Sequence, residues 1–392
     1  MKANKLLYLV FLILIVFIYT IVFKNLIFSN LHSTDLVTHI RFAQKLLSYS
    51  MEHKLYFIPH PLFHLLLIVF YLIFGSWEFS AILLLIIIVV LIYNLQIFFI
   101  SKEQKVGFFT IGSIIFSFIL MIVSSIYIPP LNNWLSPDYF SVMFSGSGTP
   151  NVLHNPTYYL VKVFVLPVFF ISKKYLGNIL ILSRKTIIIF IVLLSASVLA
   201  KPNFALSFIP AFTLLIIWNG YYKSLKPRYL FKKLLLLFSV PVIILFLQFF
   251  VMYMAGPRDS SIRFCFFCVW THWSKIPAIS ILLGIAFPLF MFFINFKRNV
   301  KNISYQFAWL FFLTSLLFAG FLCEDSYRLL AGNFFWGYNL SLYLLFFVSM
   351  IDFIELLRTK EFRIIYFKMI CATTILLLHT AGGIYHFSIY MH

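Results

Sequence analysis

Charged side chains are scarce in this sequence. Of its 392 residues only 10% are charged and only 11 are Asp or Glu, whereas about 25% of the residues in a soluble domain are charged. This composition excludes a water-soluble globular protein. The sequence also lacks a glycine-rich phosphate-binding loop, so we expect no nucleotide-driven reaction on its short polar segments.

Apolar residues dominate instead, at 62% of the chain, with 51 Phe and a mean hydropathy of +1.00. A bilayer accepts such side chains over spans of about 20 residues, and these runs lack the alternation of barrel strands. We expect an all-α fold, that of a polytopic helical membrane protein. Residues 1–392 should form one transmembrane domain with about 11 crossings (about 10 to 12). The expected helices cover residues 6–28, 61–74, 79–100, 108–128, 158–171, 186–200, 204–218, 234–254, 276–296, 303–323, 334–350 and 364–387.

The positions of Lys and Arg predict the orientation. Most of the +19 net charge lies in short clusters beside the apolar runs, and the positive-inside rule places such clusters in the cytoplasm. Because the positive charge is divided into short clusters, it indicates how the chain is oriented in the membrane. We expect no nucleic-acid partner. The N-terminus is then cytoplasmic, and the expected outer loops are residues 29–58, 129–157, 255–275 and 324–333. The basic clusters are at residues 2–5, 173–185, 223–233, 297–301 and 358–368.

One part of this topology is inconsistent. Three apolar runs lie between the outer loops 29–58 and 129–157, and an odd number of crossings would put these loops on opposite sides. Either the short run 61–74 does not cross fully, which we favour, or Lys102 and Lys105 lie outside.

The first outer loop carries His32, Asp35 and His39, spaced three and four residues apart and therefore on one face of a helix. The apolar residues that follow predict an interfacial helix at the membrane surface. Asp35 is a candidate general base for a hydroxyl group. The same three residues could instead bind a divalent metal ion, or they could simply form the polar side of an interfacial helix.

Other polar residues of the expected outer loops are candidates to line a substrate site. In the loop 129–157, turn-forming residues indicate irregular backbone, and its aromatic residues suit either sugar stacking or an interfacial belt. Among the acids, Glu324 is also expected to pair with Arg328, four residues further on. The candidate lining residues are His39, His60, Asp138, His154, Asn155, Glu324 and Asp325.

Four basic residues are candidates to bind a phosphate group. Lys201 precedes Pro202 between two apolar halves, where proline breaks a helix and a lysine is costly unless it faces a cavity, an anion or the surface. Arg258 and Arg263 lie in an outer loop, and arginine matches phosphate geometry. Arg328 completes the set.

The pair Cys265 and Cys268 fits a local disulfide or two cysteines on an apolar face, because a zinc site would need more ligands.

These features resemble the GT-C glycosyltransferases, membrane enzymes that take a sugar from a polyprenyl phosphate outside the cytoplasm. The resemblance lies in Ser33-Thr34-Asp35 after the first helix, the segment from Pro59 to His64, and the Lys201-Pro202 break. It implies a GT-C-like fold, Asp35 as catalytic base, and Lys201 with an outer-loop arginine on the lipid phosphate. A second acid soon after the first is missing from the pattern unless Glu103 supplies it. The chain is also similar to O-antigen polymerases in size, crossing number and composition.

We therefore expect a membrane glycosyltransferase of the bacterial cytoplasmic (inner) membrane, with an extracytoplasmic active site. It would move a saccharide from a polyprenyl (di)phosphate carrier to a surface polysaccharide acceptor, within the lipid bilayer. The alternative is a polymerase of lipid-linked repeat units, such as those of O-antigen; a flippase or transporter is less favoured, because ionisable groups and internal repeats are lacking in the apolar runs. No cofactor is required in this scheme, and the divalent metal remains an alternative.

Overall fold

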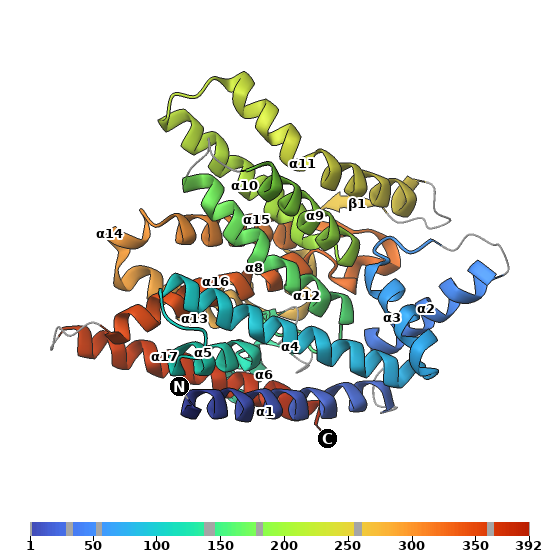
Figure 1. Cartoon of the computed structure of the whole chain (residues 1–392), viewed down its shortest axis with the longest axis horizontal. Coiled ribbons are helices and arrows are strands. Elements are labelled where there is room, and N and C mark those ends of the chain that lie inside the picture. Colours follow the sequence, from blue (N-terminus) through green and yellow to red (C-terminus); the bar gives the residue numbers. More distant parts are fainter. Residues whose placement is uncertain are drawn as a thin grey trace.

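The computed structural model describes residues 2–28, 34–51, 57–136, 146–177, 183–254, 261–358 and 364–391. Within these ranges the chain is helical except for loops and one pair of short strands (Figure 1). The expectation of an all-helical fold is thus confirmed, apart from the strand pair.

Each predicted apolar run forms a helix, because a backbone surrounded by apolar side chains satisfies its own polar groups in this way. The long helices are α1 (Lys2–Phe28), α3 (Leu62–Phe74), α4 (Trp77–Glu103), α5 (Ile111–Ile122), α8 (Pro156–Gly177), α9 (Arg184–Ala200), α10 (Asn203–Tyr222), α11 (Pro227–Phe249), α13 (Pro277–Ile294), α15 (Ile303–Phe321), α16 (Phe335–Arg358) and α17 (Ile364–Ile389).

Shorter elements connect them. Helix α2 (Asp35–Met51) is the helix predicted in the first outer loop, and it buries one side, including Leu36, Ile40 and Ala43. The others are α6 (Pro129–Leu135), the π-helical turn η2 (Phe250–Met254), β1 (Ile262–Phe264), α12 (Cys268–Trp273), α14 (Phe296–Asn299), β2 (Leu322–Glu324) and the 3₁₀ helix η3 (Ser326–Ala331).

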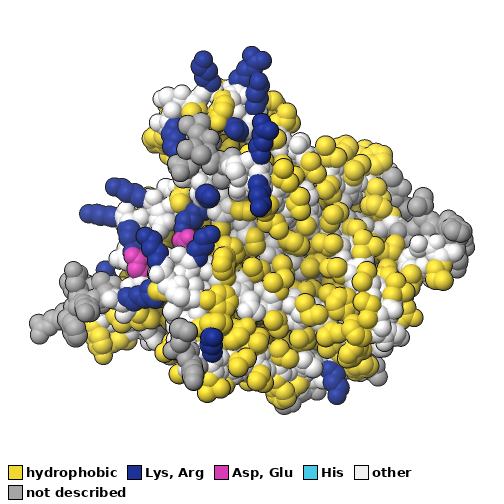
Figure 2. All heavy atoms as spheres, in the orientation of Figure 1, with side chains coloured by type: hydrophobic (Ala, Val, Ile, Leu, Met, Phe, Trp, Pro, Cys, Tyr) yellow, Lys and Arg dark blue, Asp and Glu magenta, His cyan; other side chains and the backbone are white. Residues whose placement is uncertain are grey.

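Eight helices in the described ranges are long and apolar enough to cross a membrane. They are α1, α4, α10, α11, α13, α15, α16 and α17, and hydrophobic side chains cover most of the face seen in Figure 2. On that face Lys and Arg gather at the left and upper edge, where Figure 1 places α14 and the turn between α10 and α11. The chain is a multi-pass helical membrane protein.

Polar contacts bring several basic clusters to one end of the bundle. Glu103, at the end of α4, forms an ion pair with Lys173 near the end of α8. Arg358, at the end of α16, donates a 2.7 Å hydrogen bond to Gln104. Glu103 therefore lies with the basic clusters, where it cannot serve as the second acid of a site around Asp35.

At the other end, Asn155 of the loop before α8 contacts Asp35 of α2 at 2.8 Å. The two loops that were expected outside thus meet at the same end of the bundle, as the sequence predicts. Helix α3 has 13 residues, a length of about 20 Å, which is less than the bilayer core of about 30 Å. Residues 61–74 therefore do not span the bilayer core as a straight helix, and the same holds for α5, which has 12 residues.

Helix α16 occupies the middle of the bundle and is buried along nearly its whole length (Figure 1). It carries Asn339 and Asp352, whose polar groups would be costly against lipid tails and are buried inside the bundle. Helices α15, α10, α13 and α8 pack against it, and together they position the loops that form the candidate site.

Candidate functional site

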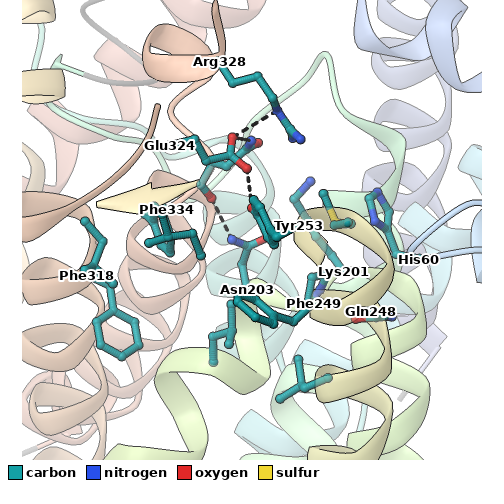
Figure 3. A pocket seen from close by; sticks show the side chains of 17 residues that line it. His60, Lys201, Asn203, Gln248, Phe249, Tyr253, Phe318, Glu324, Arg328 and Phe334 are labelled. Carbon is teal, nitrogen blue, oxygen red and sulfur yellow. Dashed lines mark hydrogen bonds and ion pairs between the residues drawn. The ribbon is translucent and has the colours of Figure 1, made fainter. Parts of the chain in front are cut away.

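A cavity of about 280 Å³ opens between α10, α11, α15 and the strand pair. Most of its wall is apolar, with Phe249, Phe318 and Phe334 among the contributing side chains. Its polar groups include Lys201, Glu324, Arg328 and His60, all four of which were predicted from sequence as site residues (Figure 3). The cavity combines a hydrophobic wall with two cationic side chains, as a site for an amphiphilic anion requires.

The strand pair decides which neighbouring residues face the cavity. Strands β1 and β2 are antiparallel, with Ile262 opposite Glu324 and Arg263 opposite Cys323. Because alternate residues of a strand point to opposite faces, Ile262, Leu322 and Glu324 share the cavity side. Arg263 lies on the other face and pairs with Asp325 at 3.2 Å. Neither of these two predicted site residues lines the cavity.

Glu324 is held on several sides. Its carboxylate accepts hydrogen bonds from Tyr253 and Asn333, and Arg328 Nε lies 3.2 Å away in the predicted i,i+4 ion pair. With its side chain only 2% exposed, this acid has the donors that a buried carboxylate needs. Glu324 is therefore an anchor for Arg328.

Arg328 keeps part of its guanidinium unpaired. While its Nε is paired with Glu324, its Nη1 is buried and has no hydrogen-bond partner among the residues that the structure describes. An unpaired buried N–H of a cationic group is costly, and an oxyanion in the cavity would satisfy it.

Lys201 lies at the predicted helix break. Helix α9 ends at Ala200, Lys201 is extended, and α10 begins at Asn203 after Pro202. Its ammonium group donates to Thr157 at 3.2 Å and to Asn155 at 3.4 Å, and lies 3.9 Å from the centre of the Trp336 ring. Burial lowers the pKa of Lys201 to about 7, while the Asp35 carboxylate opposes this shift.

Asn155 connects Lys201 to Asp35. Its Oδ1 accepts the backbone N–H of Tyr158 at 3.0 Å, the geometry of a helix N-cap, and its Nδ2 donates to Asp35 at 2.8 Å. His154 Nε2 lies 3.8 Å from the same carboxylate oxygen. Asp35 itself is half-exposed at 45% and is outside the cavity lining, so it contacts Lys201 only through Asn155.

Three histidines lie together beside this network. His39 Nδ1 is 2.9 Å from His64 Nε2, and the His39 and His60 rings are 6.1 Å apart. Desolvation, with Lys201 as the next contributor at His60, holds the pKa values of His39 and His60 well below their usual range. These imidazoles are neutral at pH 7, so the positive charge of the site comes from Lys201 and Arg328.

Arg258, Asp138 and His32 lie outside the described residues. The metal group suggested for His32, Asp35 and His39 includes His32 and therefore lies partly outside the described residues. Within the described chain, three cysteines lie close enough together to share a metal ion.

Several residues of the network escaped the sequence predictions. Tyr253, Asn333 and Asn203 contribute to the wall, and Thr157 and Trp336 surround Lys201. Of these, only Asn203 and Thr157 had a signal, because they stand beside the Lys201-Pro202 break and the Asn155-Pro156 turn. Comparison with protein families, with curated proteins and with solved structures found no match to this chain.

Proposed function

We propose that this chain is an integral membrane glycosyltransferase that uses a saccharide linked to a polyprenyl phosphate or diphosphate. The observation that supports it most directly is the unpaired, buried Nη1 of Arg328 in a largely apolar cavity that Lys201 also lines. Two cationic donors suit a phosphate group, and the aromatic and aliphatic wall suits the first isoprene units of its lipid.

In the proposed reaction, an acceptor hydroxyl gives its proton to the Asp35 carboxylate and attacks the anomeric carbon. The bond between that carbon and the phosphate oxygen breaks, and the phosphate leaves with the bonding electron pair. Lys201 and Arg328 stabilise the departing negative charge. Asn155 fixes the orientation of Asp35, which it contacts at 2.8 Å. No cofactor takes part in these steps.

Repeat-unit polymerisation is the second candidate. It is favoured by one fact: the charged groups of the cavity wall include Arg328 and Lys201, but Asp35 is not among them. An enzyme that relies on outer-loop arginines, as O-antigen polymerases do, would need no carboxylate base at that wall. In either case the active site is proposed to face the outside of a bacterial cytoplasmic membrane.

Ligand binding tests the phosphate site. Farnesyl phosphate should raise the thermal unfolding temperature of the purified protein in detergent, and farnesol, which has the same tail without the phosphate, should not. Arg328→Gln should weaken binding by about 10- to 100-fold, as loss of a charge-assisted hydrogen bond implies. Equal stabilisation by farnesol, or undiminished binding in the variant, would contradict the proposal.

Analysis of the surface polysaccharide from cells that carry the gene tests the reaction. Gel electrophoresis shows the ladder of chain lengths, and mass spectrometry gives the mass of the repeat unit. In a deletion strain, or with Asp35→Ala, an intact ladder of lighter repeat units would indicate a transferase that adds a branch. Loss of the ladder with a single repeat unit retained would indicate the polymerase. An unchanged ladder and unchanged repeat-unit mass in the deletion strain would exclude both functions.

A further inference from the structure

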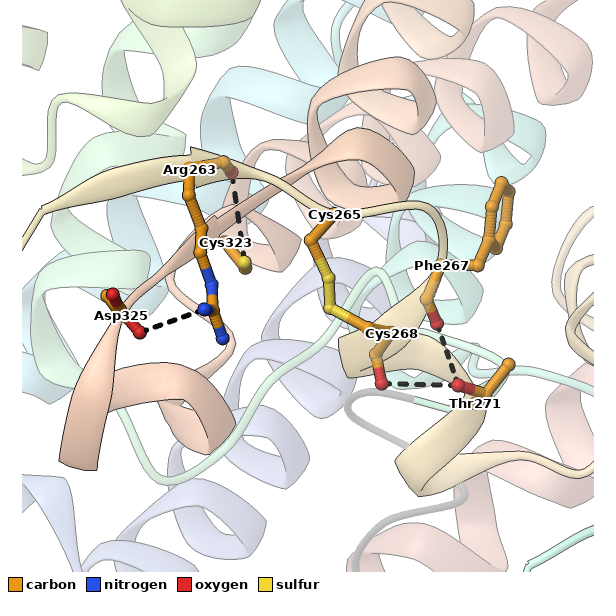
Figure 4. Close-up of a disulfide and its surroundings, with 7 residues drawn as sticks. All are labelled: Arg263, Cys265, Phe267, Cys268, Thr271, Cys323 and Asp325. Carbon is orange, nitrogen blue, oxygen red and sulfur yellow. Dashed lines mark hydrogen bonds and ion pairs between the residues drawn. A yellow bond between two sulfur atoms is a disulfide. The ribbon is translucent and has the colours of Figure 1, made fainter.

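Three sulfur atoms meet on the face of the strand pair that points away from the cavity. Cys265 and Cys268 form a disulfide, Cys323 is a buried free thiol, and all three sulfurs lie within 4.8 Å of one another (Figure 4). In the described part of the chain this is the only group of three such ligands. The cluster is separate from the proposed phosphate site.

The backbone holds these sulfurs together. The N–H groups of Cys265 and Phe267 donate to Phe321 and Gly320, at 2.8 and 2.6 Å, which ties the Cys265 to Cys268 turn to the end of α15. Phe267 has a positive φ of 51°, so the chain turns sharply between the two cysteines. The β1–β2 register then places Cys323 opposite Arg263, two residues before Cys265.

The potential metal ligands at this cluster are almost entirely sulfur atoms. Cys323 Sγ donates only a long 3.7 Å contact, to the carbonyl of Arg263. No His, Asp or Glu joins the three sulfurs as a further ligand among the described residues. Zinc takes four ligands in structural sites, whereas soft thiolates select Cu(I). A set of three sulfurs therefore fits Cu(I) better than zinc.

We propose that Cys265, Cys268 and Cys323 form a binding site for Cu(I) when the disulfide is reduced. A two-electron reductant, such as a phosphine or a dithiol, converts the disulfide into two thiols. Cu(I) then binds three thiolates, the three thiol protons pass to solvent, and the oxidation state of the metal does not change. This site goes beyond the proposed function and does not depend on it.

The cysteine cluster is connected to the cavity through strand β2. Cys323 directly precedes Glu324, whose carboxylate anchors Arg328, and Leu322 on its other side lines the cavity. Exchanging the disulfide for a metal ion that also binds Cys323 would join β2 to the turn that follows β1.

Competition with a chromogenic chelator tests the proposal. The full-length protein in detergent, reduced with a phosphine under nitrogen, is titrated with Cu(I) in the presence of bicinchoninate. We expect one tight equivalent per chain in the wild type and in Cys371→Ser, which removes the fourth cysteine of the sequence and serves as the matched control. Cys323→Ser should lose the tight equivalent. Its retention in Cys323→Ser, or its absence from the wild type, overturns the proposal.

Alkylation of the wild type keeps the test independent of how the variants fold. With Cu(I) bound, iodoacetamide labelling followed by mass spectrometry should find Cys265, Cys268 and Cys323 protected and the labelling of Cys371 unchanged. Labelling of Cys323 at the same rate with and without Cu(I) would refute the site.

Discussion

The Nδ2 group of Asn155 donates a 2.8 Å hydrogen bond to Asp35, which lies 120 residues earlier in the chain. This bond joins the start of α2 to the start of α8. It also orients the carboxylate that we propose as the base, while the Oδ1 atom of the same side chain lies 3.4 Å from Lys201 Nζ.

Replacing Asp35 by Asn keeps the shape of the side chain and removes its ability to take up a proton. If Asp35 is the base, transfer should fall by about 10²- to 10⁴-fold. Farnesyl phosphate binding should change little well below pH 7, where Lys201 is charged in both proteins, because Asp35 is outside the cavity lining. Transfer is measured on membranes that contain the endogenous lipid-linked donor. If Asp35→Asn transferred saccharide at the wild-type rate, another group would have to accept the proton.

Removing the Asn155 side chain tests positioning. Asn155→Leu lacks the group that caps α8 and orients Asp35, so we expect loss of transfer together with a stability loss of about 1 kcal/mol from the missing cap. Asn155→Ser, which can still cap the helix, should recover stability but not transfer. Transfer at the wild-type rate in Asn155→Ser would show that the contact with Asp35 has no functional role.

Binding of farnesyl phosphate should depend on pH through Lys201. Burial lowers the pKa of this lysine to about 7, so its charge, and with it phosphate affinity, is present at lower pH and is lost as pH rises through that value. His39 and His60, whose pKa values lie well below their usual range, stay neutral above pH 7 and add no transition there. Because a bound phosphate favours the charged form, the measured midpoint should lie at or above the value for the free protein.

Lys201→Arg is the matched variant for this titration. Arginine keeps its charge over the whole range and can still lie over the Trp336 ring. The second ionisation of the phosphate has a pKa of about 6, so the binding curve of this variant should be flat only above about pH 7, up to about pH 9. The same fall in affinity in wild type and Lys201→Arg would assign the transition to another group.

The two arginines of the strand region should behave differently. Arg328→Gln leaves the buried Glu324 without its cationic partner, and we expect a loss of about 3–5 kcal/mol in unfolding free energy, part of which Glu324→Gln should restore in the double variant. Arg263→Ala removes an exposed pair with Asp325 and should cost at most about 1 kcal/mol, with unchanged phosphate binding. Denaturant unfolding in detergent measures both. A larger effect of Arg263→Ala would contradict the assignment of the two strand faces.

The helices could be predicted from the sequence, because a helix in a bilayer needs a long apolar run. Each predicted run is helical. The sequence also located the break at Lys201 and the pair of Glu324 with Arg328, since both depend on neighbours in the chain. It could not reveal the β1–β2 pairing, because strands of three residues show no alternation. For that reason Arg263 was placed in the site and Cys323 was overlooked.

The burial of α16 has a consequence for how the protein is made. A nascent helix leaves the insertion machinery into lipid, yet α16 carries Asn339 and Asp352 in positions that the finished protein shields from lipid. Helices α8, α10, α13 and α15, which pack against it, all precede it in the chain. They can therefore form a groove that receives α16 when it emerges, and α17 packs against it afterwards.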